Sequence, residues 1–415
     1  MSNTTGTNDP HAARGALAAL SLCMLLPSLG TSIVNVALPG FVEEFGAPYQ
    51  QVQWVVVAYL LANAALIVGI GRLGDRIGRR RLLIAGLVVF TAASLLSAVS
   101  VQLWQLVAAR ALQGVGAAAL IALSMALVGE TVGKERTGRA MGLLGTMSAI
   151  GTALGPSLGG VLVAGFGWPA VFVVNLPLAA LALFLVRRHL PPDRPVAVHA
   201  MAPPWITTLR RDPALVRGLA MTTLVSTVVM ATLVVGPFHL TSAFGLGVAG
   251  VGFVMSAGPI VSALTGLPAG RLVDRLGTAR TTTAGLVGMA TGCLALALVP
   301  LSWGIAGYVV PLVILTAHYA LFQAANNTAV MRDVPADRRG AVSGMLNLSR
   351  NLGLVAGASL MGGVYAHAGV QATFVLATGL VALALLTAGA HRHPREGGDP
   401  RKHQRLSRGS PASRG

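Results

Sequence analysis

The sequence predicts an all-α integral membrane protein made of two similar six-helix halves, and three observations lead to this prediction. The 415-residue chain is 54% apolar and only 10% charged, with a mean hydropathy of +0.71, whereas soluble domains are about 25% charged. Its apolar residues form twelve long runs. A charged stretch between two of these runs, Gly71–Arg81, returns as a weaker copy at Gly270–Arg280. A duplicated membrane protein accounts for all three observations.

The twelve apolar runs are long enough to be membrane spans, because a helix needs about 20 apolar residues to cross a hydrocarbon core of about 30 Å. The expected helices cover roughly residues 16–39, 52–72, 82–100, 103–128, 139–163, 168–188, 215–239, 248–270, 281–300, 304–330, 340–364 and 370–390. The first run is too long for the apolar region of a signal peptide, so we expect it to be a retained helix. An even number of spans brings both ends of the chain to the same side of the membrane.

The duplication is visible residue by residue. The two charged stretches keep Gly71/Gly270, Arg72/Arg271, Leu73/Leu272, Asp75/Asp274, Arg76/Arg275, Gly78/Gly277 and Arg81/Arg280 in register. A second set, in the fifth and eleventh runs, is Glu135/Asp337, Arg136/Arg338, Gly138/Gly340, Gly142/Gly344, Gly151/Gly353 and Gly155/Gly357. Six helices return the chain to its starting side, so the halves are predicted to be parallel repeats.

The net charge of +17 is confined to alternate loops and the two tails. The basic loops are 72–81, 134–139, 187–217, 271–280 and 332–339. In a soluble protein this charge would suggest nucleic acid binding, but an excess of Lys and Arg in every second loop is typical of membrane proteins and marks the cytoplasmic side. We therefore expect a multi-pass protein of a cell membrane, with a bacterial inner membrane as the favoured location, with both termini in the cytoplasm and no nucleic acid partner.

Composition also divides the chain into segments. We expect a cytoplasmic tail over 1–15, a first bundle over 16–188, a linker over 189–214, a second bundle over 215–390 and a basic tail over 391–415. The linker is rich in proline and arginine, which neither pack a core nor continue a helix. The last segment has too few apolar residues to fold and is expected to be disordered and dispensable.

Several motifs resemble the major facilitator superfamily, and the resemblance covers residues 16–390. Gly71–Leu83 matches the family's motif A, and Arg110–Ala117 looks like its motif B. The glycine spacing of the fifth run is similar to motif C, which in this family marks exporting antiporters. The resemblance implies two six-helix bundles around a central cavity that opens alternately to the two sides of the membrane.

Two further stretches, Ser32–Pro39 and Trp168–Pro177, are similar to the drug:proton antiporter branch of that family. That branch usually has fourteen helices, and this chain has no room for the extra central pair. It also has Gly30 where the branch commonly has an aspartate. The resemblance implies proton-coupled efflux of small amphipathic compounds or drugs across the lipid bilayer.

The charged stretch after the second helix is interpreted as a conformational latch. Its glycines permit close approach of a neighbouring backbone, and Asp75 is an acceptor suited to a helix N-terminus. The resemblance suggests that this neighbour is the eleventh helix near Gly340, and the repeat would place Asp274 at the start of the fifth helix. The arginines at 79–81 are expected mainly to set topology. The predicted latch residues are Gly71, Gly74, Asp75, Arg76, Asp274 and Arg275.

The fifth helix is predicted to be a packing surface and a bend between the halves, because its glycines form a stripe and its proline removes a backbone hydrogen bond. A purely structural role, without influence on transport direction, is the alternative. The residues concerned are Gly142, Gly151, Gly155, Pro156, Gly159 and Gly160.

Two arginines lie deep in the predicted membrane spans, Arg350 about 15 Å and Arg110 about 10 Å from a helix end at 1.5 Å per residue. An arginine at the centre of a helix costs about 2.5–3.5 kcal/mol on insertion scales, so each should face the bundle interior or a wet cavity. For Arg110, bonding to backbone carbonyls is an equal alternative. No carboxylate lies within the spans, so His318 is the candidate proton site, with a packing role as its alternative. The predicted cavity and coupling residues are Asn35, Arg110, Gln113, His318, Phe322, Asn347 and Arg350.

The sequence thus favours a secondary transporter of a small-molecule substrate, with protons as coupling ions. The alternative is a transporter of an organic anion or carboxylated metabolite, which the two buried arginines without internal carboxylates would suit. A non-transporting membrane receptor or scaffold is a remote alternative. The sequence contains no metal-ligand cluster, nucleotide-binding glycine loop or nucleophile triad. We therefore expect no enzymatic activity, no cofactor and no metal.

Overall fold

The computed structural model is almost entirely helical and describes residues 10–131, 137–193, 212–332, 334 and 339–389. Its elements are α1 (Pro10–Ser32), η1 (Ile33–Ala37), α2 (Leu38–Phe45), α3 (Tyr49–Val52), α4 (Trp54–Ile77), α5 (Arg79–Ala98), α6 (Leu103–Thr131), α7 (Thr137–Phe166), α8 (Ala170–Val173), α9 (Asn175–His189), α11 (Pro213–Phe244), α12 (Val248–Leu276), α13 (Thr278–Leu298), η3 (Leu301–Trp303), α14 (Gly304–Met331), α15 (Arg339–Ala356), η4 (Gly357–Met361) and α16 (Gly362–Gly389).

The described helices contain twelve membrane-spanning segments, as predicted. Eleven stretches are long and apolar enough to cross a membrane, and the last, Gly344–Ala388, has 45 residues. At 1.5 Å per residue it would reach about 68 Å, twice the thickness of the hydrocarbon core. Gly369 interrupts it with φ 77° and ψ −174°, which is not a helical conformation. The stretch is therefore two spans joined by a turn.

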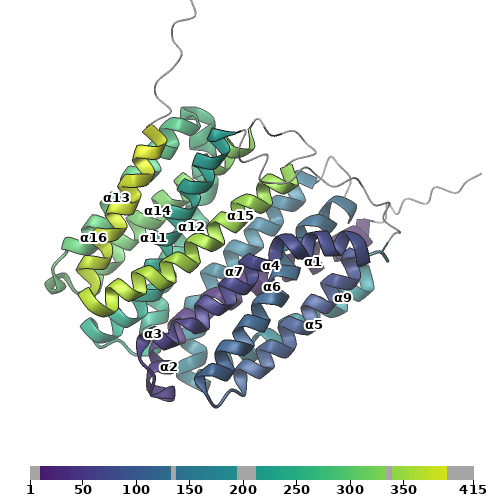
Figure 1. Ribbon diagram of the computed structural model, residues 1–415, viewed down its shortest axis with the longest axis horizontal. Coiled ribbons are helices and arrows are strands. Elements are labelled where there is room, and N and C mark those ends of the chain that lie inside the picture. Colours follow the sequence, from purple (N-terminus) through teal and green to yellow (C-terminus); the bar gives the residue numbers. More distant parts are fainter. Residues whose placement is uncertain (1–9, 132–136, 194–211, 333, 335–338, 390–415) are drawn as a thin grey trace, which may run out of the picture.

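The spans form two bundles that lie side by side. Figure 1 shows α1 to α9, in purple and blue, on one side and α11 to α16, in teal to yellow, on the other, with α7, α12 and α15 near the middle. Most buried apolar side chains belong to two large clusters, one centred on each bundle, and each takes in a few residues of the other bundle. Across the middle, α7 packs on α12 and α4 packs on α15. The predicted architecture of two six-helix bundles is confirmed.

Glycines with a left-handed backbone repeat between the two halves. Gly46 and Gly245, with φ 55° and 62°, end the first span of each half, and Gly78 and Gly277, with φ 106° and 81°, form the turn after the second. Both pairs are 199 residues apart, the offset of Gly71/Gly270. L residues with a side chain rarely adopt this conformation, so the glycines kept at these turns have a direct physical reason.

Some helix boundaries differ from the predicted ones. The first span begins at Pro10, inside the predicted 1–15 tail, and continues through η1 to Phe45, where Gly46 ends it with a left-handed turn. The seventh span begins at Pro213, because Asp212 accepts hydrogen bonds from two backbone N–H groups of the first turn. Residues 194–211 of the linker and the predicted 391–415 tail lie outside the described residues.

Candidate functional site

A cavity of about 170 Å³ lies in the second bundle, close to its boundary with the first. Its lining residues come from α6, α11, α14 and α15 and are Met125, Thr222, Val225, Ser226, Tyr319, Phe322, Gln323, Asn326, Asn327, Leu346, Asn347 and Arg350. These residues occupy the part of each helix nearest the end where α4 meets α5 and where α11 begins. We call this the basic end, because the predicted basic loops lie there.

The cavity lining combines one cation with amides, hydroxyls and aromatic rings. Arg350 is the only charged residue among the lining residues, and no carboxylate accompanies it. Asn326 strengthens the cavity wall, because its Nδ2 donates to the Gly218 carbonyl oxygen at 3.1 Å and to Thr222 Oγ1 at 2.9 Å. These bonds join α14 to α11. The site can therefore contact an apolar body and one negative charge at once.

Three of the predicted cavity residues line this cavity: Phe322, Asn347 and Arg350. Sequence reasoning missed the contribution of α11, which supplies Thr222 and Ser226. A signal was present, since α11 carries hydroxyl side chains four residues apart inside an otherwise apolar run, and residues at that spacing share one helix face.

Arg110 lies elsewhere, in a fully buried network inside the first bundle. Its side chain is 0% exposed. Its Nε donates to the Val55 carbonyl oxygen at 3.0 Å, and its Nη1 donates to the Gly30 carbonyl oxygen at 3.2 Å and to Gln113 Oε1. The guanidinium carbon lies 4.2 Å from the ring centre of Tyr59. Of the two predicted readings for Arg110, bonding to backbone carbonyls is the one found.

The network extends through Gln113 to a third neighbour. Gln113 Nε2 donates to Ser94 Oγ at 2.7 Å, and Ser94 Oγ donates to the Phe90 carbonyl oxygen at 2.8 Å. Gln113, like Arg110, is therefore buried away from the cavity. Arg110 and Gln113 together bond α6 to α1, α4 and α5.

Glycines on α6 permit this convergence of helices. A Cβ atom at Gly114 would lie 2.3 Å from the Tyr59 carbonyl oxygen on α4, and one at Gly116 would lie 2.7 Å from the Phe90 backbone nitrogen on α5. Any side chain there would push α6 away from both helices. The close approach brings the carbonyl oxygen atoms within reach of Arg110.

Asn35 and His318 also lie outside the cavity lining. Asn35 is buried in η1, where its Nδ2 donates to the carbonyl oxygens of Thr31 and Ser32 and its Oδ1 has no partner. His318 packs on α13, where a Cβ at Gly288 would lie 2.0 Å from the imidazole ring. Its Nδ1 lies 2.7 Å from the Ile314 carbonyl oxygen, one turn earlier.

At the end opposite to the basic end, the two bundles touch directly. A Cβ at Gly252 of α12 would lie 2.4 Å from the Pro156 carbonyl oxygen of α7, and one at Gly160 would lie 3.0 Å from the Gly252 Cα. Backbone therefore meets backbone, without intervening side chains. We call this contact the glycine seam.

A second contact at the same end is aromatic. The ring of Tyr49, on α3, lies 4.8 Å from that of Phe238 on α11 and 6.2 Å from that of Tyr365 on α16. A Cβ at Gly362 would lie 2.3 Å from Tyr49 Oη and 2.8 Å from Gln53 Oε1. Both polar atoms are buried without a hydrogen-bond partner. We call these five residues the aromatic plug.

The two contacts are related by the internal repeat. Gly362 is 202 residues after Gly160, which is the offset of Gly151/Gly353, and Gly252 is 199 residues after Gln53, which is the offset of the charged stretches. Corresponding positions thus join the bundles twice. In the glycine seam, a glycine contacts a glycine. In the aromatic plug, a glycine contacts the large polar side chains of Tyr49 and Gln53.

The glycine stripe of α7 has two different partners. Cβ atoms at Gly151, Gly155 and Gly159 would lie 2.7, 2.5 and 2.8 Å from the Leu25 carbonyl oxygen, Ser32 Cβ and the Ile33 carbonyl oxygen. These glycines therefore pack within the first bundle, on α1 and η1. Pro156 and Gly160 lie against Gly252 of the second bundle, and a Cβ at Gly142 would meet open space.

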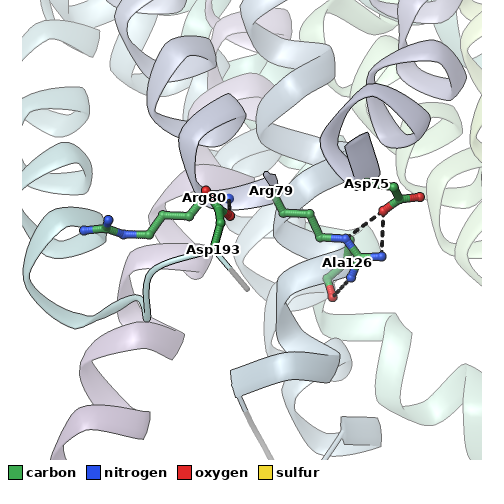
Figure 2. Close-up of polar contacts among 5 residues, drawn as sticks. All are labelled: Asp75, Arg79, Arg80, Ala126 and Asp193. Atoms are coloured by element: carbon green, nitrogen blue, oxygen red, sulfur yellow. Dashed lines mark hydrogen bonds and ion pairs between the residues drawn. The ribbon is translucent and has the colours of Figure 1, made fainter. Parts of the chain in front are cut away.

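The charged turn at the basic end is held by ion pairs within the first bundle. Figure 2 shows the Arg79 side chain directed toward Asp75, with a salt bridge of 2.8 Å, and toward the carbonyl oxygen of Ala126 on α6 at 3.5 Å. A Cβ at Gly74 would lie 2.5 Å from Leu123 of α6, whereas one at Gly71 would meet open space. The close neighbour of Gly74 is therefore α6 and not the eleventh helix.

The same turn receives a carboxylate from the start of the linker. Asp193 accepts a hydrogen bond from the backbone nitrogen of Arg80 at 2.7 Å (Figure 2). It also accepts one from the backbone nitrogen of Arg81 at 3.1 Å. Three arginines at the N-terminus of α5 oppose the helix dipole, and a carboxylate there offsets them. Arg79, Arg80 and Arg81 thus make specific contacts, which the topology interpretation did not foresee.

The remaining predicted latch residues, Arg76, Asp274 and Arg275, are exposed at the basic end. The hydrogen bonds and ion pairs of the described residues do not join Asp75 to α15 or Asp274 to α7. The latch therefore stays a prediction.

Comparison with known proteins identifies the chain's relatives. A sequence profile described as Major Facilitator Superfamily matches residues 20–358. The riboflavin transporter RibZ of Clostridioides difficile (strain 630) is 28% identical over 393 residues, covering 83% of this chain and 86% of RibZ. The multidrug efflux pump LfrA of Mycolicibacterium smegmatis is 29% identical over 413 residues, covering 86% of this chain and 82% of LfrA.

Solved structures share the same fold. A bacterial homologue of the human lysosomal transporter Spinster, in an inward-facing and unoccupied conformation, superposes with a TM-score of 0.75. The two chains are 16% identical, and the match covers 92% of this chain and 97% of that one. At this identity the likeness concerns the fold alone.

Proposed function

Because the chain belongs to the major facilitator superfamily of multi-pass membrane transporters, we propose that it is a secondary active transporter that exports small amphipathic compounds in exchange for protons. The observation that carries this proposal is the asymmetry between the two ends. A polar cavity lies toward the basic end, while the bundles touch at the opposite end through the glycine seam and the aromatic plug. This is the arrangement of one conformation in an alternating cycle.

Opening to the opposite side requires separation of the bundles at those contacts. The glycine seam has no side chains to rearrange, so the bundles can pivot there with little loss of packing. The aromatic plug buries Tyr49 Oη and Gln53 Oε1 without partners, and a buried polar group without a hydrogen bond costs about 1–3 kcal/mol. Water reaching these atoms on opening would return part of that free energy. The plug is therefore suited to open.

The latch at the basic end is the proposed counterpart of the plug. In the present arrangement Asp75 pairs with Arg79, and we propose that it exchanges this partner for the start of α15 when the basic end closes. Substitution of Asp75 by Asn should slow turnover while the protein still inserts into the membrane. Loss of insertion instead would assign the whole stretch to topology.

Export and proton coupling are supported by likeness to exporting antiporters. The α7 glycines have the spacing of the exporters' motif, and one relative is a multidrug efflux pump. His318 is the proposed proton site, acting from the contact between α13 and α14. If His318→Ala leaves the pH dependence of transport unchanged, His318 does not carry the proton. The basic loops support a bacterial inner membrane location with both termini in the cytoplasm.

A second candidate function, transport of an organic anion, is favoured by one observation. Among the described residues, Arg350 is the only charged one that lines the cavity, and no described carboxylate is there to balance the charge of a cationic drug. Arg110 is not needed for this candidate, since it is buried in its own network.

Transport by purified protein in proteoliposomes tests the main proposal. With an acidic interior, protons leaving the vesicle should drive accumulation of a neutral or cationic amphiphile, and riboflavin and rhodamine 6G are suitable fluorescent probes. A protonophore should abolish the accumulation. A transport rate that does not change with the imposed pH gradient would exclude proton antiport. The absence of flux for every probe class would exclude transport.

A further inference from the structure

Arg350 is a cation in the cavity that no other described residue pairs. It lies about eleven residues into α15 and is partly exposed to the cavity. A guanidinium has five N–H donors and no acceptor. Within the residues that the structure describes, Arg350 makes neither a hydrogen bond nor an ion pair. Such a charge inside a membrane span is unfavourable unless water or an anion contacts it.

The neighbours of Arg350 are neutral and partly occupied with one another. Asn347 accepts a hydrogen bond from Asn351 Nδ2 at 3.2 Å, and Asn326 is bonded to α11. On the neighbouring turns of α15, no described acceptor forms a hydrogen bond with Arg350. Its N–H donors are therefore available to a ligand in the cavity.

The rest of the cavity lining offers apolar contact and a few polar groups without a partner among the described residues. Met125, Val225 and Phe322 present carbon and sulfur surface. Ser226, Tyr319, Gln323 and Asn327 line the same space, and none of these four forms a side-chain hydrogen bond with another described residue. A ligand that fits has one charged end, an apolar or aromatic body and some hydrogen-bonding capacity.

We propose that the cavity binds an amphipathic monocarboxylate, whose carboxylate pairs with the Arg350 guanidinium and whose apolar body lies against Tyr319, Phe322 and Met125. Arginine holds a carboxylate through two parallel hydrogen bonds. Among the described residues, Arg350 is the single cation of the lining. A monoanion balances its charge, whereas a phosphate monoester would bring a second, unpaired negative charge. This inference rests on the proposed function, because it names the substrate class of the same cavity.

Binding of matched probes to the purified protein tests the proposal. The probes are a series of aryl carboxylates from benzoate to 2-naphthylacetate, and for each the neutral primary amide, the amine and the phosphate monoester. We expect a saturating carboxylate to raise the thermal unfolding midpoint by at least about 2 °C more than its matching amide, amine or phosphate monoester does. Equal shifts by amides or amines, or no shift with any carboxylate, would overturn the proposal.

Substitutions identify the residue that carries the charge selectivity. Arg350→Gln should weaken carboxylate binding by about tenfold or more, and Arg350→Lys should retain part of it, because lysine keeps the charge but loses the bidentate geometry. Arg332→Gln is the matched control, since Arg332 is exposed at the end of α14 and contacts Thr278. Carboxylate binding that survives Arg350→Gln would also overturn the proposal.

The outcome can be separated from that of the proposed function. Flux of neutral or cationic amphiphiles in proteoliposomes, without carboxylate binding, would support the proposed transport function and contradict the carboxylate site. Carboxylate binding that depends on Arg350, without flux of any probe class, would confirm the anion site and remove the transport proposal.

Discussion

Each bundle has an arginine within a membrane span, and the two arginines have opposite surroundings. In the first, Arg110 is fully buried and bonds two backbone carbonyl oxygens and a glutamine. In the second, Arg350 faces the cavity, without a partner among the described residues. The difference teaches that a cation in a membrane span has two roles. A cation surrounded by carbonyl dipoles holds helices together. A cation that is unpaired in a cavity is available to bind a ligand.

The two arginines also differ in what surrounds their apolar part. The Arg110 guanidinium stacks on Tyr59, and Tyr59 Oη donates to the Pro27 carbonyl oxygen at 2.9 Å, so α4 is tied to α1 beside it. The network contains no carboxylate, and Arg110 Nη2 has no partner. The charge is thus distributed over dipoles and a ring face, which suits a permanent structural role better than a cycle of proton exchange.

The largest expected effect is that of Arg110→Met. Methionine keeps much of the volume but leaves the Val55 and Gly30 carbonyl oxygens without their donor. A buried polar group left without a hydrogen bond costs about 1–3 kcal/mol, and several lose a partner here, so we expect a lower thermal unfolding midpoint and a smaller yield from membranes. Leu112→Met, at an exposed position two residues further along α6, is the control. An unchanged midpoint for Arg110→Met would mean that the network does not stabilise the bundle.

Chemical accessibility should separate the two sites next. Both native cysteines, Cys23 and Cys293, are buried, so an introduced thiol can be followed alone. A maleimide applied to inside-out vesicles should label Arg350→Cys about tenfold or more faster than Gln113→Cys, because only the cavity admits reagent. Similar labelling rates would mean that both positions are accessible to water, which would contradict the difference between a cavity site and a buried network.

Tyr59 tests the smaller parts of the Arg110 network. Tyr59→Phe keeps the ring but removes the hydrogen bond to Pro27, which should lower the free energy of unfolding by about 1 kcal/mol. Tyr59→Leu removes the ring as well and should lower the free energy of unfolding by a further amount of about 0.5–2 kcal/mol. Thermal unfolding of both variants gives the two values. If the leucine variant equals the phenylalanine variant, the ring does not contribute to holding the cation.

The smallest expected effect is that of Arg350→Met on stability. Because Arg350 has no partner in the described part of the chain to lose, the free energy of unfolding should change by less than about 0.5 kcal/mol. The same thermal measurement as for Arg110→Met gives a direct comparison. A large loss of stability would assign Arg350 a structural role like that of Arg110.

Some features of the site could be read from the sequence, and others could not. Arg350 was placed in the cavity because an ionisable residue in the middle of a span must face away from lipid. Phe322 and Asn347 were placed there because the family that the chain resembles builds its cavity from these helices. The rule for ionisable residues applied to His318 as well, but it cannot distinguish a cavity from a contact between helices. Gly288, thirty residues earlier on α13, decides that His318 packs against a neighbouring helix.

Contacts between distant segments were likewise beyond the sequence. Asp193 lies in the proline-rich linker, more than a hundred residues from the arginines whose backbone it caps. The glycines of α7 were expected to join the bundles, and most of them pack on α1 instead. A glycine stripe specifies that another backbone comes close, but it carries no information on which backbone that is.

The sequence by itself determined the twelve spans and the duplication, and it predicted the basic end. These properties are local, because the bilayer thickness fixes the length of each apolar run and loop charges bias orientation loop by loop. Only the tertiary structure decided which arginine is buried and which faces the cavity. That choice depends on the rotation of each helix about its axis, which is set by packing against helices far away in the chain.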